Sequence, residues 1–360
     1  MNKYAYPSIR GWMMVLCQFC FLFLISYCFY VFPIQMGLKW GLGMSLSFFV
    51  LSMMVIVVAV LLFYYFKTKT KLFILKFVAS LGLGVCFFAS LMTFMILLLT
   101  TYIDVDDFNK FICMILLTNV CAIYARYQGS IIRLKTITIA SSKLTESKTL
   151  VFISDVHIGT RSSGYLESLV NQIQALNPDY VLIGGDLIDS SATTIDDLRV
   201  LTDLSMPIYF VTGNHEYYLE CSDLMLSQLK DVSIYWLNDK AITLPGFQLI
   251  GVNDNQSTES QCHVISQSLD LESFSIVMVH KPSCFDALEQ KPDLMVSGHT
   301  HNGQIFPFGL LVRLRFPKIY GLYEENASKL YVSSGVGTWG NNMRLGSVNE
   351  IVCFQLNSCS

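Results

Sequence analysis

Three long uncharged runs dominate the first 103 residues of the chain. They cover residues 11–38, 40–66 and 77–103 and hold 28, 27 and 27 residues. Each exceeds the roughly 20 apolar residues that cross a hydrocarbon core of about 30 Å as a helix. A fourth run, 111–125, has 15 uncharged residues and spans only if Lys110 and Arg126 extend their side chains to the headgroups. A chain with such runs does not fold as one ordinary water-soluble domain.

We therefore predict a membrane domain in residues 1–135, with four transmembrane helices at about 11–32, 41–66, 77–103 and 108–125. The first run is longer than the apolar core of a cleaved signal peptide, so we expect it to remain as an anchor. Lys and Arg gather before the first span, between the second and third, and after the fourth. By the positive-inside rule, both termini then face the cytoplasm in the plasma (inner) membrane. With only three spans, the second half of the chain would lie outside.

The balance of charge reverses near residue 146. Residues 1–145 contain 12 Lys+Arg and 3 Asp+Glu, whereas the remainder contains 12 and 24. The acidic second half argues against nucleic acid as a partner, because binding it requires a basic face. No Asp, Glu, Lys, Arg or His lies inside the first three uncharged runs, which argues against a transporter. The 11 cysteines show no disulfide or zinc spacing outside these runs, which favours a reducing compartment.

From residue 148 onward the sequence predicts an α/β domain, 148–360. Short apolar runs rich in Val, Ile, Phe and Tyr end in polar residues at 150–157, 180–189, 208–216, 275–282 and 294–301. Residues 165–176 and 194–204 have helical spacing and lie between the first three runs. This order is typical of parallel, buried strands, and 247–252, 329–332 and 351–354 add further strands.

In each of the five runs, the polar residues follow the apolar ones. They therefore lie at the carboxyl end of a strand, where open α/β sheets bind their ligands. Five of the six histidines are in these clusters: His157, His215, His280, His299 and His301. The sixth, His263, is not. The five histidines are joined by Asp155, Asp186, Asp189 and Asn214. Crowded carboxylates are costly without counterions, so we expect divalent metals, and N and O ligands suit Mn²⁺, Fe²⁺ or Zn²⁺.

Each cluster alone is weak, because Asp is common at helix caps and Gly-Asn pairs are common in turns. As an ordered set they resemble the calcineurin-like metallophosphoesterases: D-x-H, G-D-x-x-D, G-N-H-E, a lone H and G-H-x-H. The resemblance covers about residues 148–356. The stretches SGHTHNGQ and GVGTWGNNMRLGSVNEI resemble the bacterial membrane-associated branch, except that Asn302 stands where many members have Gly. The resemblance implies a four-layer αββα sandwich of two mixed sheets.

The resemblance also implies roles for single residues. Asp155, His157 and His301 would hold one metal, Asn214, His280 and His299 the other, and Asp186 would bridge them. Two such ions, Mn²⁺ being favoured over Fe²⁺ or Zn²⁺, activate a hydroxide that attacks a phosphoester or pyrophosphate. His215 would act at the leaving oxygen, and Asp189 would orient a ligating imidazole.

Two segments bear on the substrate, which contains phosphate. Residues 303–323 mix apolar side chains with Arg313, Arg315 and Lys318, which favours either a segment that seeks the membrane interface or an ordinary covered loop. Arg344 is a candidate phosphate contact or a surface ion-pair partner. With the membrane anchor, these features favour a lipid-linked substrate, such as that of the UDP-2,3-diacylglucosamine hydrolases of lipid A synthesis. A broad phosphomonoesterase or phosphodiesterase of soluble nucleotides and a catalytically silent membrane scaffold stay open, as does the oligomeric state.

Overall fold

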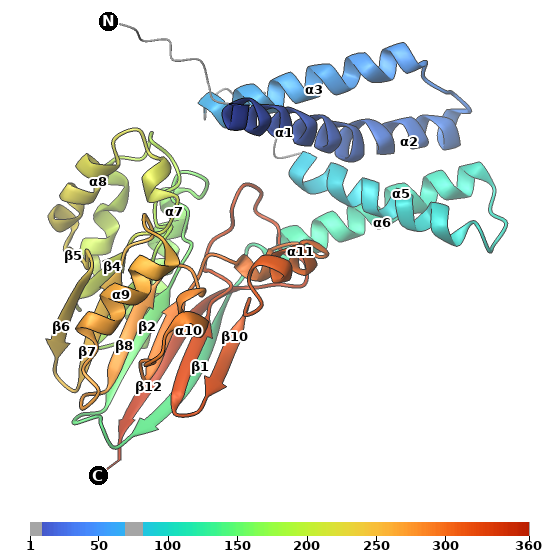
Figure 1. The fold of residues 1–360 in the computed structure, drawn as a ribbon. Coiled ribbons are helices and arrows are strands. Elements are labelled where there is room, and N and C mark those ends of the chain that lie inside the picture. The colour runs from blue at the N-terminus through green and yellow to red at the C-terminus, as the bar shows by residue number, and fades with distance from the viewer. Residues whose placement is uncertain (1–8, 69–81, 360) are drawn as a thin grey trace, which may run out of the picture. The chain divides into compact units, whose positions relative to one another are not determined.

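A computed structural model describes residues 9–68 and 82–359 of the chain (Figure 1). It contains two compact units, residues 1–124 and 125–360. The second unit is larger and holds all twelve strands of the described residues. All 11 cysteines are free.

The first unit consists of helices. Two helical stretches among the described residues are long and apolar enough to cross a membrane, Cys17–Leu42 and Asp107–Gln128, and two shorter apolar helices are Phe48–Phe63 and Gly84–Leu99. The four-span topology stays a prediction, and residues 77–81 of its third span lie outside the described residues, as do Lys69, Lys71 and Lys76. The elements are α1 (Ile9–Ile25), the π-helical turn η1 (Ser26–Val31), α2 (Phe32–Leu42), α3 (Phe48–Thr68), the π-helical turn η2 (Gly82–Cys86), α5 (Phe87–Leu99) and α6 (Asp107–Gln128).

The first helical stretch is longer than the predicted span 11–32. It continues through Pro33 to Leu42 without a break in the helical backbone. The π-helical turn η1 lies just before this proline. The stretch ends at Gly43, which adopts the left-handed conformation with φ 64°. The next helix therefore begins at Phe48 and not at residue 41.

The second unit contains two six-stranded mixed sheets, in the strand orders β1-β12-β2-β3-β4-β5 and β10-β11-β9-β8-β7-β6. In the first sheet only the β12–β2 pair is antiparallel. In the second sheet the two outer pairs are antiparallel. The strands are β1 (Ile132–Ser141), β2 (Lys148–Ile153), β3 (Tyr180–Gly184), β4 (Ile208–Val211), β5 (Ile234–Trp236), β6 (Lys240–Leu244), β7 (Phe247–Val252), β8 (Ser275–Val279), β9 (Leu294–Ser297), β10 (Gly321–Glu325), β11 (Ser328–Val332) and β12 (Asn349–Ser358).

Helices cover the outer face of each sheet (Figure 1). Side chains alternate along a strand, so Val151 and Ile153 face α7 while Leu150 and Phe152 pack between the sheets. This confirms the predicted αββα sandwich. The helices are α7 (Ser163–Leu176), η3 (Ile195–Asp203), η4 (Glu216–Tyr218), α8 (Ser222–Gln228), η5 (Leu229–Val232), α9 (Thr258–Ser268), α10 (Cys284–Ala287), η6 (His301–Gly303) and α11 (Phe308–Arg315).

The strand β1 was not expected from the sequence. We predict the membrane domain to end at 135 and the α/β domain to begin at 148, but β1 pairs in parallel with β12 over Ile132 to Ser141. The boundary between the units also lies earlier than predicted, since the second unit begins at Ala125. The strand was missed because it lies at the edge of the sheet, where its mostly exposed, partly charged residues lack the apolar run of a central strand.

Candidate metal centre

Five strands deliver polar side chains to one region of the second unit. Asp155 and His157 follow β2, and Asp186 follows β3. His215 follows β4, His280 follows β8, and His299 and His301 follow β9. Their ligand atoms form three overlapping groups, in each of which every atom lies within 4.8 Å of the others. The groups are Asp155, His157 and His301; His157, Asp186 and His215; and Asp186, His280 and His299.

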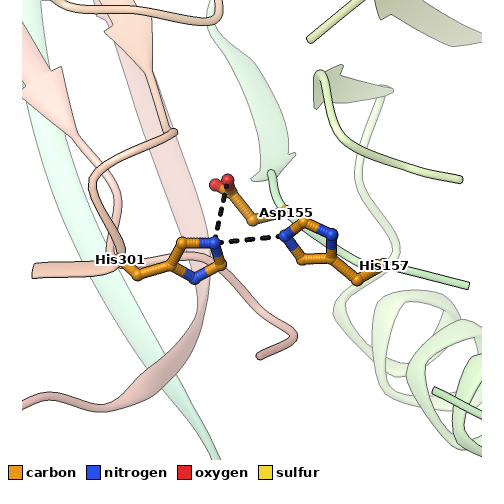
Figure 2. A group of neighbouring side chains, drawn as sticks. All are labelled: Asp155, His157 and His301. Carbon is orange, nitrogen blue, oxygen red and sulfur yellow. Dashed lines mark hydrogen bonds and ion pairs between the residues drawn. The ribbon is translucent and has the colours of Figure 1, made fainter. Parts of the chain in front are cut away.

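The first group joins both sheets of the sandwich. The Nε2 atoms of His157 and His301 are 3.1 Å apart, and His301 Nε2 is 3.4 Å from Asp155 Oδ1 (Figure 2). The side chains of Asp155 and His157 are completely buried. The two imidazoles and the carboxylate therefore converge on one point, as the ligands of a cation do.

The third group is built around His280. Its Nδ1 lies 2.8 Å from the carbonyl oxygen of Gly184 and donates to it, which leaves Nε2 free to accept or to ligate. This Nε2 is 3.2 Å from both Asp186 Oδ2 and His299 Nδ1. Asp186 belongs to this group and to the group with His157, so its carboxylate lies between the two clusters.

Asn214 lies between Gly213 and His215 in the loop after β4. Its Oδ1 atom is buried and has no hydrogen-bond partner among the described residues. A buried amide oxygen without a partner costs free energy, on the order of 1–3 kcal/mol. A cation bound beside it would remove that cost, so the residues present fit a metal.

The ligand residues share an unusual backbone conformation. Five of them have φ between 48° and 69°: Asp155, His157, Asp186, His299 and His301. Non-glycine residues rarely adopt this left-handed region, and strain of about 1–3 kcal/mol per residue is usually retained at functional sites. Backbone hydrogen bonds hold the turns, since Asp155 N–H donates to Gly185 O and His157 N–H to Asp186 O, both at 3.0 Å.

Electrostatics also suit metal binding. Burial lowers the pKa of His299 to about 2 and holds the pKa of His301 well below its usual range, so both imidazoles are neutral. Burial raises the pKa of Asp155. Burial also opposes ionisation of Asp186, but His280, His157 and His215 hold the pKa of its carboxyl well below its usual range. Neutral imidazoles and ionised carboxylates bind divalent metals. Burial lowers the pKa of His280, but Asp186 and Asp155 raise it to about 10, so a metal at His280 would have to displace a proton.

His215 belongs to the group with His157 and Asp186 and is held by two carboxylates. Its N–H donates to Asp186 Oδ1 at 2.8 Å, and its Nδ1 hydrogen-bonds to Asp189 Oδ1. Burial lowers the pKa of His215, but the bond to Asp189 and the charges of Asp186, Asp189 and Glu216 together raise it. We expected Asp189 to orient a ligating imidazole, yet it lies 3.9 Å from His157 Nδ1 and binds His215 directly.

Glu216 is the last residue of the G-N-H-E motif, and the sequence assigns no role to it. Its buried carboxylate accepts the N–H groups of Asp186 at 3.0 Å, Ile188 at 2.9 Å and Gly213 at 2.7 Å. It thereby ties the loops after β3 and β4 together. Burial raises its pKa to about 7. Its position directly after His215 was the only signal in the sequence.

Two glycines permit close approach at the centre. A Cβ atom on Gly213 would overlap Asp186 Oδ1, and one on Gly298 would overlap Ser154 Oγ. Ser154 Oγ in turn donates to Asp155 Oδ2. Any larger residue at these positions would displace a carboxylate of the metal groups.

Arg344 is neither a phosphate contact nor a surface residue. It is completely buried, and burial lowers its pKa to about 10. Its guanidinium donates to the carbonyls of Ser334 and Gly337 at 2.6 Å, and to that of His301 at 3.0 Å. Arg344 thus stabilises the loop that carries His301, one of the candidate metal ligands.

Comparisons with known proteins agree with this geometry. Residues 148–303 match the family model described as calcineurin-like phosphoesterase. An uncharacterised metallophosphoesterase of Helicobacter pylori is 33% identical over 236 residues, which cover 62% of this chain and 64% of that protein. One from Aquifex aeolicus is 31% identical over 245 residues, covering 64% and 93%. A Bos taurus transmembrane protein with a metallophosphoesterase domain is 33% identical over 230 residues, covering 56% and 51%.

Proposed function

Because the chain belongs to the calcineurin-like metallophosphoesterase family, we propose that it is a membrane-anchored hydrolase of phosphoester or phosphoanhydride bonds that uses two divalent metals. The observation that carries this proposal is the sharing of Asp186 between two groups of ligand side chains. Asp155, His157 and His301 would hold one ion, and Asn214, His280 and His299 the other. Mn²⁺ is the favoured metal, with Fe²⁺ and Zn²⁺ as alternatives, since the donor set contains no thiolate.

Bound metals would supply the charge that makes water nucleophilic near neutral pH and that neutralises phosphoryl oxygens. The protein supplies the rest. His215 carries a raised pKa and lies within 4.8 Å of ligand atoms of His157 and Asp186, so it would be placed to donate a proton to a leaving oxygen. Asp189 would stabilise the protonated imidazole through Nδ1, and Nε2 lies on the side of Asp186, 3.9 Å from its Oδ2.

The test is phosphatase activity of the full chain in detergent, with p-nitrophenyl phosphate and bis-p-nitrophenyl phosphate, with and without Mn²⁺. We expect Asp186→Asn to lose one or both metals and to lower turnover by more than about 100-fold, the upper limit for residues that only support a ligand. Asp179→Asn, which removes an exposed carboxylate beside the same sheet, is the matched control. If the wild-type chain and Asp186→Asn are equally inactive while metal is bound, the result would favour a catalytically silent scaffold.

For the substrate we propose a lipid-linked phosphate compound, with UDP-2,3-diacylglucosamine as the specific candidate. Support comes from the long apolar helices and from the Bos taurus relative, whose name describes a transmembrane protein. The Lys and Arg pattern further supports a catalytic unit on the cytoplasmic face of the inner membrane. The full chain should release UMP from this lipid. Hydrolysis of soluble nucleotides alone would refute the lipid substrate and leave the hydrolase intact.

A further inference from the structure

The helix α11 presents an apolar face to solvent. Leu310 is 60% exposed, Leu311 62% and Leu314 84%, and Phe306 in the preceding turn is 55% exposed. At about 100° per residue the three leucines occupy an arc of about 100° around the helix. Arg313 and Arg315 lie at the two borders of this arc. We call Phe306, Leu310, Leu311 and Leu314 the leucine face.

Charge separates this segment from the rest of its unit. Residues 303–323 contain three basic residues and no Asp or Glu, whereas residues 146–360 as a whole hold twice as many acidic as basic residues. Lys318, which we expected to be available for headgroups, is paired with Asp286. Arg313 and Arg315 have no acidic residue on their own helix to neutralise them. The leucine face is thus bordered by cations that complement an anionic surface.

Both ends of α11 are joined to the metal groups. At its start, the turn η6 begins with His301, and Gly303 lies directly against the backbone of Gly309. At its end, the ring of Phe316 packs edge-on against the ring of His299, with centroids 5.1 Å apart. A surface bound by the leucine face would therefore lie at the border of the metal centre.

Hydrogen bonds also join the turn before α11 to the loop of residues 339–344. Gln304 exchanges two hydrogen bonds with the backbone of Trp339, at 2.9 and 3.0 Å, and the indole of Trp339 is partly exposed. In the same loop, Arg344 N–H donates to the carbonyl of Ala125 in the last turn of α6 at 2.8 Å.

We propose that the leucine face docks on an anionic lipid bilayer, with Arg313 and Arg315 at headgroup level. The leucines enter the acyl boundary, and the arginines extend to the phosphates, as in interfacial amphipathic helices. The proposal rests on the membrane-anchored function above and adds to it a contact surface beside the metal centre. Headgroups would thus be presented to the metal ligands without leaving the bilayer.

The experiment uses the full chain in vesicles of radiolabelled phosphatidylcholine, with or without phosphatidylglycerol. A photo-reactive p-benzoylphenylalanine replaces Leu311 or, as a matched control, Leu224, which is 59% exposed on α8. We expect lipid adducts at position 311 and not at 224. Phosphatidylglycerol should raise the yield at 311 by about fivefold for each arginine, and Arg313→Gln with Arg315→Gln should remove that increase.

Three outcomes would overturn the docking: no lipid adduct at 311, equal lipid adducts at 311 and 224, or adducts at 311 only with protein. The last would assign the leucine face to another part of this chain or to a second copy. Turnover of p-nitrophenyl phosphate is measured in the same vesicles. Turnover without lipid adducts refutes only the docking, whereas lipid adducts without turnover refute only the hydrolase.

Discussion

In the first unit large apolar side chains such as Phe48, Val120 and Ile123 are exposed, and the buried polar residues are small: Ser26, Thr93 and Thr118. In the second unit the apolar side chains fill three layers of core, and the buried polar residues include Asp155, His157 and His280. The first unit therefore has large apolar side chains on its outside, whereas the second has charged side chains in its interior.

The difference indicates what surrounds each unit. Apolar side chains on the outside are stable when the solvent is lipid, where an exposed Phe or Val costs nothing. Charged groups on the inside are stable only if they are paired or hold a metal. The first unit thus has the apolar surface that the proposed membrane anchor requires, and the buried polar groups of the second unit form the candidate metal centre.

The largest effect is expected at His215, a polar group inside the second unit. His215→Gln should lower kcat by about 10²–10⁴-fold while metal content is unchanged. The loss should be greater for alkyl phosphates than for p-nitrophenyl phosphate, because p-nitrophenolate leaves without a proton. His263→Gln, at an exposed position of α9, is the control. An equal loss for both substrate types would exclude the role of proton donor.

The next effect concerns the buried cation. Arg344→Met leaves the carbonyls of Ser334, Gly337 and His301 without their donor, at a cost of about 1–3 kcal/mol for each buried unpaired group. Hydrogen exchange of β12 and of residues 299–305 should accelerate by about two orders of magnitude or more, since 1.4 kcal/mol is a factor of ten. Peptides from α7 serve as an internal reference. Unchanged exchange would show that the arginine is dispensable.

The smallest effect tests the outside of the first unit. Val120 is 63% exposed on α6, and Val120→Lys should disfavour membrane insertion by about 2.5–3.5 kcal/mol. The measurement is the fraction of chain that resists carbonate extraction. Leu224→Lys, at a similarly exposed apolar position of the second unit, should change stability by less than about 0.5 kcal/mol. If the two substitutions have the same effect, α6 does not face lipid.

Much of the second unit could be predicted from the sequence. The apolar runs and the polar residues that follow them are local patterns, and the rule that ligands gather at the carboxyl ends of parallel strands converts them into a site. The structure brings Asp155, His157, Asp186, His280, His299 and His301 together as that rule predicts. Glu216 was missed because its role, accepting three backbone N–H groups, leaves no pattern in sequence.

The sequence by itself determined the apolar runs of the first unit, the α/β order of the second and the set of candidate metal-binding side chains, because hydrophobicity and residue type act locally. Tertiary structure alone decided that β1 joins β12, that Asp189 binds His215, that Arg344 is buried and that the leucine face is exposed. Each of these depends on segments distant in the chain meeting in space, and on whether a neighbouring side chain or solvent then covers the residue.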